Sequence, residues 1–172
     1  MKIAPRPFFI ASAFVTAATA LISGWHFLSE RQVDELSCAT KAIMRFEGMQ
    51  YENINANVHF NFREQGKGSL IVEGYTHSAS GSLYLQRYVS FNYSSQRISP
   101  AERHYRIVQW QASASSIDES PDVIFDYFMR EMSDSHDGLF LSVQKLNDKA
   151  VLIGSINSPL FVCTLKPGNK LS

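Results

Sequence analysis

One apolar run near the N-terminus constrains this chain more than any other feature. Residues 8–28 read FFIASAFVTAATALISGWHFL and carry no charge, whereas Lys2 and Arg6 precede them. At about 1.5 Å per residue, such a helix spans roughly 30 Å, the thickness of a bilayer's hydrocarbon core. Positive charges before the run favour a cytoplasmic N-terminus. The sequence predicts a cytoplasmic tail at 1–7, one transmembrane helix at 8–28 and an exported remainder.

The same segment has an alternative reading as a cleaved signal peptide. Ala18-Thr19-Ala20 resembles a cleavage site after a short basic region and an apolar stretch. Against cleavage, the apolar run continues to Leu28, where a mature N-terminus would usually turn polar. Both readings place the remainder in an exported compartment, most simply the bacterial periplasm, and retention makes the chain a single-pass protein of the inner membrane.

Small residues recur at intervals of four within the run. Thr16, Ala20 and Gly24 would lie on one face of a helix, as in small-xxx-small helix association. These three residues are the candidate helix contacts in the membrane.

The exported part carries the only two cysteines, Cys38 and Cys163. An oxidising compartment favours a disulfide between them, and the alternatives are two buried thiols or a bridge to a partner. Lys2 and Arg6 precede the apolar run, so the exported part contains 14 of the 16 basic residues and all 16 acidic ones. Such a balance gives no basic footprint for direct nucleic-acid binding.

Period-two alternation dominates the sequence after a stalk at 29–40. In residues 55–63, apolar residues alternate with polar ones, and the glycines of Gln65-Gly66-Lys67-Gly68 predict a hairpin to a strand at 69–76. Further strands are predicted at these ranges: 83–93, 104–113, 139–146, 150–155 and 160–165.

One helix interrupts the strands. Ser120 is a suitable N-cap, Pro121 fits the first helical position, and apolar residues follow at helical spacing from Phe125 to Met132. The predicted fold of 41–172 is therefore a single, mainly antiparallel β (α+β) domain, a curved sheet or partial barrel with one helix, whose open edge a partner could cover.

Four residues are candidates for ligand or partner contact. Arg87 shares a predicted strand face with apolar residues, so it is either paired in the interior, turned out by a bulge, or in contact with an anion. Phe60, Phe62 and Trp110 belong to the aromatic set that would line a curved sheet.

The chain has no signature of catalysis or of a bound metal. No nucleophile elbow, P-loop, dinucleotide glycine pattern or helical histidine pair is present, and we expect neither an enzyme nor a cofactor. Seven acidic residues between Asp118 and Asp137 indicate either a solvated helix face or a surface for a basic companion.

Several segments together resemble the FidL-like membrane proteins, which are companions of ToxR-type membrane-spanning transcription regulators and analogous to ToxS. The segments are the basic tail with its apolar run, Cys38, Gly74-Tyr75, Arg87 before VSFNY at 89–93, and SPLFVC at 158–163.

This resemblance implies a partner. It implies a periplasmic β domain that binds, and stabilises or modulates, the periplasmic domain of a ToxR-like regulator as a heterodimer. In related pairs the joint domain resembles a lipocalin-like barrel that can admit a bile-salt-like amphiphile. The alternative function is therefore a periplasmic binding module for a lipid or similar amphiphile.

Overall fold

A computed structural model divides the chain into two compact units, Met1–Val33 and Asp34–Ser172. The structure describes residues 19, 35–46, 51–133, 138–155 and 158–167. The transmembrane helix predicted at 8–28 lies outside these residues, except for Thr19, and so do Thr16, Ala20 and Gly24. Within the described part of the chain, no helix is long and apolar enough to cross a membrane.

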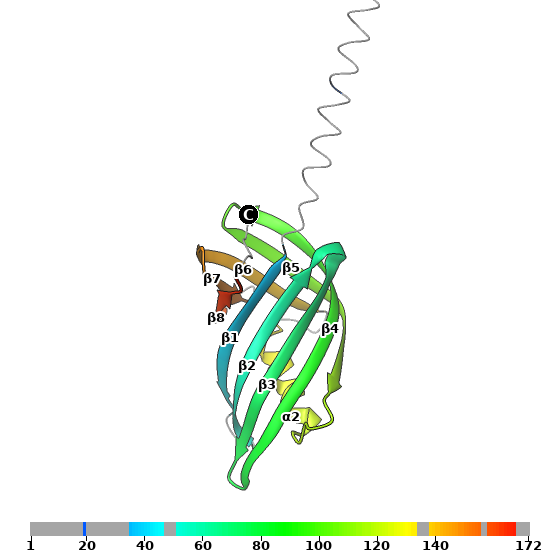
Figure 1. The fold of residues 1–172 in the computed structure, drawn as a ribbon, viewed down its shortest axis with the longest axis vertical. Coiled ribbons are helices and arrows are strands. Elements are labelled where there is room, and N and C mark those ends of the chain that lie inside the picture. Colours follow the sequence, from blue (N-terminus) through cyan, green and yellow to red (C-terminus); the bar gives the residue numbers. More distant parts are fainter. Residues whose placement is uncertain (1–18, 20–34, 47–50, 134–137, 156–157, 168–172) are drawn as a thin grey trace, which may run out of the picture. The chain divides into compact units, whose positions relative to one another are not determined.

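The second unit consists of eight antiparallel strands and one α-helix (Figure 1). In chain order the elements are β1 (Leu36–Arg45), β2 (Tyr51–Arg63), the 3-10 turn η1 (Glu64–Gly66), β3 (Lys67–Ser78), β4 (Gly81–Ser99), β5 (Glu102–Ala114), α2 (Asp122–Glu131), β6 (Leu139–Asn147), β7 (Ala150–Gly154) and β8 (Pro159–Leu165).

The strands close into a barrel, so the predicted curved sheet or partial barrel is wrong. Each strand pairs with its neighbour in sequence, and β1 also pairs with β8 at Cys38–Leu165 and Ala39–Thr164. The prediction failed at β1, whose first five residues it had assigned to the stalk at 29–40. This strand is rich in residues that favour helices, and its pairing with β2 and β8 overrides that preference.

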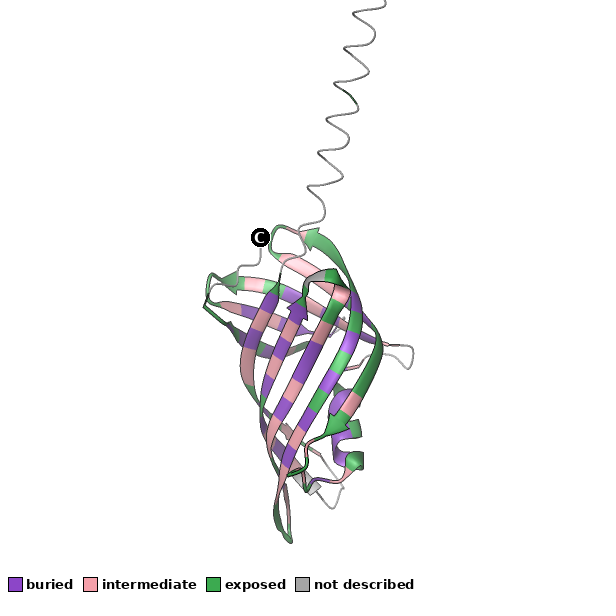
Figure 2. Cartoon of the chain, turned by 45° about the vertical axis from the view of Figure 1, so that its right-hand side comes forward, coloured by how far each residue is buried: buried purple, intermediate pink, exposed green. Residues whose placement is uncertain are grey.

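Alternation along the strands builds the core. In β2, Ala56, Val58, Phe60 and Phe62 are each at most 2% exposed, whereas the polar residues between them are more exposed. The same banding repeats on neighbouring strands and on one face of α2 (Figure 2). Because side chains of a strand alternate between its two faces, the register of β2 with its neighbours sends every second residue into the barrel.

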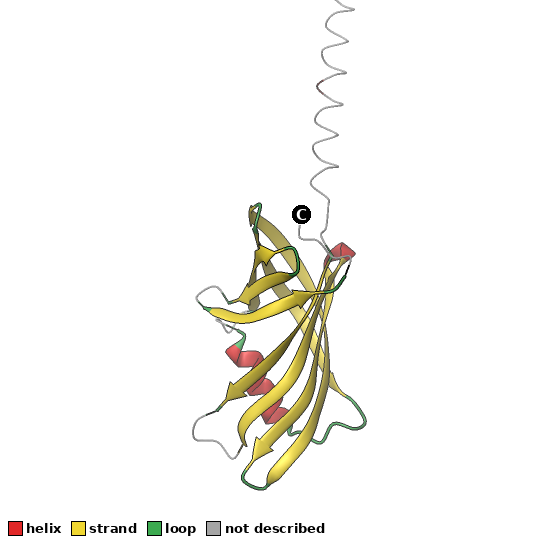
Figure 3. Cartoon of the chain, turned by 60° about the vertical axis from the view of Figure 1, so that its left-hand side comes forward, coloured by secondary structure: helices red, strands yellow, loops and turns green. Residues whose placement is uncertain are grey.

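The barrel has two unlike halves. At the upper end in Figure 1 lie the start of β1 and the β2–β3, β4–β5 and β6–β7 connections, and here all eight strands take part. At the lower end only β1–β5 continue, because β6–β8 are short, and α2 lies in the gap that they leave (Figure 3). We use "upper end" and "lower end" in this sense below.

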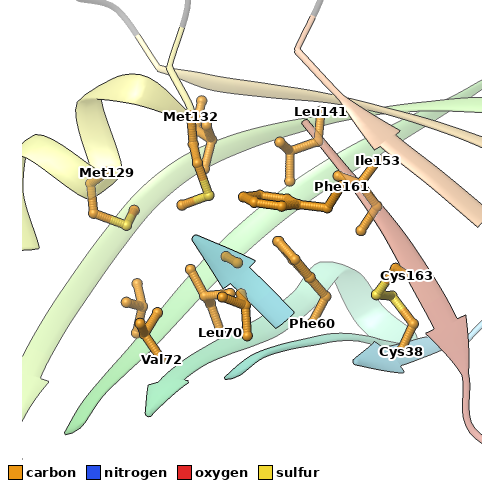
Figure 4. Close-up of a cluster of buried hydrophobic side chains, with 14 of the residues drawn as sticks. Cys38, Phe60, Leu70, Val72, Met129, Met132, Leu141, Ile153, Phe161 and Cys163 are labelled. Atoms are coloured by element: carbon orange, nitrogen blue, oxygen red, sulfur yellow. A yellow bond between two sulfur atoms is a disulfide. The ribbon is translucent and has the colours of Figure 1, made fainter. Parts of the chain in front are cut away.

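Side chains fill the interior. Phe62 contacts Tyr105, Tyr93 and Phe91, with ring centroids 4.2, 5.1 and 5.5 Å apart. Met129 of α2 and Met132, which directly follows the helix, belong to the same core (Figure 4). The inside of the barrel is therefore a packed core that includes one face of the helix.

Candidate interaction site at the edge of β5

The lower half of β5 has a strand neighbour on one side only. β6 pairs with residues 102–107 of β5 and begins at Leu139, opposite Ile107. Residues 110–114 pair with β4, but no strand of the described chain pairs with their other side. An uncovered strand edge presents main-chain donors and acceptors that can extend the sheet.

The register identifies the groups on this edge. The Ser115 N–H donates to the Gln86 carbonyl at 3.0 Å, and Ala114 stands opposite Arg87. Hydrogen-bonded and non-bonded pairs alternate along an antiparallel ladder, so Gln111 and Ser113 bond to β4. The N–H and C=O groups of Trp110, Ala112 and Ala114 therefore point away from β4, toward the open side.

A β-bulge sets the direction of Trp110. Trp110 stands opposite Phe91 and Ile107 opposite Tyr93, so Val108 and Gln109 together face the single residue Asn92. Gln109 has a left-handed backbone, with φ of 78°, and its Oε1 accepts from Asn92 Nδ2 at 3.0 Å. The extra residue brings Trp110 to the same face as Ile107, beside α2, where the indole is still 44% exposed.

A groove of about 250 Å³ separates the β5 edge from α2. It runs between Trp110 on the strand and Met129 on the helix, and Leu139 at the start of β6 forms its upper limit. Asp126, Arg130 and Ser133 supply polar groups along its rim. The groove thus joins a hydrogen-bonding strand edge to an apolar floor, which is the combination that strand-addition sites use.

The edge of β1 on the other side of α2 is more covered. Beyond Ala39, β1 has no pairing with β8, and a groove of about 330 Å³ lies beside it. Here Tyr127 of α2 packs on Phe46, with ring centroids 6.1 Å apart, and Arg130 stacks on the Tyr127 ring at 4.2 Å. Side chains of α2 therefore pack beside the end of this edge, whereas the groove at the β5 edge keeps the half-exposed Trp110.

Arg87 holds the loop before α2 against β4. Its Nε donates to Asp118 Oδ2 at 2.9 Å, its Nη2 to the Ser120 carbonyl at 2.7 Å, and its Nη1 to Asp122 Oδ1. The side chains of Arg87 and Asp118 are only 7% and 2% exposed. The Asp118 carboxylate also accepts from the N–H groups of Gln86 and Ser120, so this cluster fixes where the helix begins.

The surroundings of Arg87 favour its charged form. Burial by itself lowers the pKa of the Arg87 guanidinium, but hydrogen bonds and Coulombic attraction from Asp118 and Asp122 raise it above its ordinary value. Of the readings open for Arg87, the structure shows an internal salt bridge, with a side chain that is only 7% exposed.

The other predicted residues divide between the core and the edge. Cys38 and Cys163 form a disulfide, as predicted, which joins β1 to β8. Phe60 and Phe62 are each 1% exposed inside the barrel. Of the four candidate contact residues, only Trp110 lies at an accessible site.

Sequence reasoning missed Asp118 and Gln109. Asp118 belongs to the acidic segment that was assigned to a solvated face or to a companion, although a carboxylate for Arg87 was required somewhere. The bulge at Gln109 has no sequence signal, because glycine or asparagine would be the usual residue in that backbone conformation. Within the described residues, no group of three metal-ligating side chains is close enough to hold an ion.

Comparison with known proteins gives one family match. The model of the family described as "FidL-like putative membrane protein" matches residues 74–163, from β3 through β8, which includes the β5 edge, α2 and the Arg87 cluster. No curated protein matches the chain.

Proposed function

Because this chain belongs to the FidL-like family, we propose that it is an accessory protein of a ToxR-like transmembrane transcription regulator. In this proposal the barrel lies in the periplasm at the inner membrane, binds the periplasmic domain of the regulator as a heterodimer, and stabilises or modulates it. The protein has no catalytic activity of its own and makes no direct contact with DNA.

The unpaired edge of β5 carries this proposal. A main-chain edge beside an apolar groove matches a protein segment in extended conformation better than any small molecule, since the outward groups repeat along the strand at Trp110, Ala112 and Ala114. A strand of the regulator added here would continue the line of β6 toward the lower end and would cover Trp110. The disulfide is in keeping with an oxidising compartment.

The alternative function, binding of a lipid or bile-salt-like amphiphile, has less support. The aromatic residues that would line such a cavity pack on one another, and α2 fills the remaining space with Phe125, Phe128 and Met132. An amphiphile would therefore have to displace α2 from the core before it could enter.

A proline substitution tests the proposal at the edge itself. Ala112→Pro removes an N–H that points to the open side and leaves the hydrogen bonds of Gln111 and Ser113 to β4 in place, which an edge strand tolerates. Ala112→Val is the matched control, because it also enlarges the side chain but keeps the N–H.

The readout is capture from membranes of the native host with the full-length tagged chain. We expect the wild type and Ala112→Val to recover a protein with a DNA-binding domain and one membrane span, and Ala112→Pro to recover much less of it at an unchanged melting temperature. Recovery of no such regulator by the wild type would refute the function. Equal recovery by Ala112→Pro would refute only the site.

A further inference from the structure

Two turns at the upper end of the barrel form one composite tip. The β4–β5 turn lies at 100–101 and the β6–β7 turn at 148–149. The Lys145 N–H donates to the Ala101 carbonyl at 2.7 Å, which fastens the two turns side by side.

Large apolar side chains are exposed on this tip. Ile98 at the end of β4 is 48% exposed, and Leu146 at the end of β6 is 49% exposed. Pro100 and Ala101, which are also exposed, lie in the turn beside them. The described chain places no strand over these residues, so their apolar surface faces outward.

Basic residues surround the exposed apolar pair. Arg97 precedes Ile98, and Lys145 and Lys149 flank Leu146. Among the residues that the structure describes at the upper end, eight basic residues stand against four acidic ones. The basic residues are Arg63, Lys67, Arg97, Arg103, Arg106, Lys145, Lys149 and Lys166, and the acidic ones are Glu35, Glu64, Glu102 and Asp148. Two of those acids are engaged locally, Asp148 with Lys145 and Glu102 with His104.

The lower end has the opposite charge. It too exposes apolar side chains, Ile117 at 59% and Val123 at 51%. Their neighbours in sequence are acidic: Glu119 and Asp126 are exposed, and Asp118 and Asp122 pair with Arg87. Ile43 on the lower part of β1 is also exposed, at 63%, between the bases Lys41 and Arg45. At the upper end, by contrast, the exposed apolar residues coincide with an excess of positive charge over the whole end.

We propose that the upper end of the barrel docks on the surface of a bilayer that contains anionic phospholipids. Ile98 and Leu146 enter the interfacial layer, and Arg97 and Lys149 contact the phosphates, while Lys145 pairs with Asp148. Apolar residues flanked by bases suit such an interface, because the apolar area and the attraction to anionic lipid add to each other. β1 begins at this same end of the barrel. The family to which the chain belongs is one of membrane proteins, so a bilayer is a surface that this end can meet. This inference goes beyond the accessory function and needs no regulator.

The experiment compares backbone hydrogen exchange of the full-length chain in two kinds of lipid nanodisc. One kind contains only phosphatidylcholine, and the other contains phosphatidylcholine mixed with phosphatidylglycerol. We expect the amides of residues 96–102 and 145–150 to exchange about tenfold more slowly in the anionic discs, and high salt to reverse this protection. Amides of the lower end should exchange equally in both.

Two variants test the residues. In Arg97→Glu/Lys149→Glu, the loss of two cations weakens docking by about fivefold for each, so the extra protection in anionic discs disappears. The matched control, Lys41→Glu/Arg45→Glu, reverses two exposed charges on the lower part of β1 and should retain it. In Ile98→Ser/Leu146→Ser, the amides of residues 96–102 and 145–150 should exchange faster than in the wild type in both kinds of disc.

Three results would overturn the proposal. Equal exchange of the two turns in neutral and anionic discs would do so, and so would a failure of the chain to associate with either kind. Protection that appears only after a regulator is added, whatever the lipid, would assign this surface to a protein partner instead. None of these results bears on the β5 edge, which the capture experiment tests separately.

Discussion

Arg87 illustrates how a single charge can organise a segment that is distant in sequence. A guanidinium on an apolar strand face needs anions within hydrogen-bonding distance. The loop before α2 supplies Asp118, and the first residue of α2 supplies Asp122. The sequence predicted that Arg87 lies on an apolar strand face, and an interior ion pair was one of the readings that followed from this position. It did not identify Asp118, because which of seven nearby acids reaches the arginine depends on the path of the loop.

Removal of the Arg87 charge should be strongly destabilising. In Arg87→Met the Asp118 carboxylate, 2% exposed, would stay buried without its counter-ion. We expect the free energy of unfolding in urea to fall by about 3–5 kcal/mol. The double variant Arg87→Met/Asp118→Leu removes both charges and should recover much of that loss. If the double variant were as unstable as the sum of the two single ones, the buried pair would not be the cause.

Tyr93 should make stability depend on pH in the alkaline range. Its hydroxyl donates to the Arg63 carbonyl at 2.6 Å, and burial, assisted by Glu35, raises the pKa of the phenol above the ordinary value of 10.0, although Arg103 acts against this. A raised pKa in the folded state means that the contribution is complete below 10.0 and is lost as pH rises through the folded value.

The test of this contribution is urea unfolding of the wild type and Tyr93→Phe at neutral pH and above pH 10.0. At neutral pH the variant should be less stable by about 1 kcal/mol, because the hydrogen bond is lost. The wild type should lose more stability than the variant on going to alkaline pH. Parallel pH profiles for the two proteins would show that Tyr93 makes no such contribution.

At the scale of elements, the sequence correctly predicted those strands and the helix in which the spacing of apolar residues favours a single structure. The strands from β2 to β8 and helix α2 lie close to their predicted ranges, since strict alternation or helical spacing fixed which face was buried. β1 was missed because its sequence, LSCATKAIMR, has weak alternation and several good helix formers. The bulge at Gln109 was missed for a similar reason, as it depends on the pairing of β4 with β5.

Close packing of β2 on β3 depends on a residue without a side chain. An added Cβ at Gly74 would lie 2.1 Å from the Asn55 carbonyl oxygen and 2.5 Å from the Ala56 Cα, both main-chain atoms that cannot rotate away. Gly74→Ala should therefore destabilise the barrel by about 2 kcal/mol or more. Thermal unfolding measures this, with Ala79→Ser in the exposed β3–β4 turn as a control that should change little.

At the scale of the whole molecule, closure is the feature that the sequence left undecided. Strand patterns predicted the seven strands from β2 to β8 in their order, but they gave neither β1 nor its meeting with β8. Here the β1–β8 ladder is short, and the disulfide from Cys38, which belongs to this ladder, to Cys163 adds a covalent link between the two strands. The open edge beside Trp110 exists because β6 begins only at Leu139, opposite Ile107, and so leaves the rest of β5 without a strand on that side.

Loss of the disulfide should weaken the whole barrel. The crosslink spans 125 residues, and the chain-entropy model assigns such a loop roughly 4–5 kcal/mol of stabilisation. Cys38→Ser/Cys163→Ser should therefore lower the urea midpoint markedly, and the wild type in a thiol reductant should match the variant. Equal midpoints for the oxidised wild type and the variant would show that the short ladder closes the barrel unaided.

The meeting of β1 with β8 also imposes an order on biogenesis. Residues 36–45 are made early, yet one of their two strand partners ends at residue 165, so β1 must wait with one edge exposed until almost the whole domain is available. Contacts between such distant segments form slowly. During that interval the nascent sheet is vulnerable to misassembly, and a companion that covers a free edge would protect it as it folds.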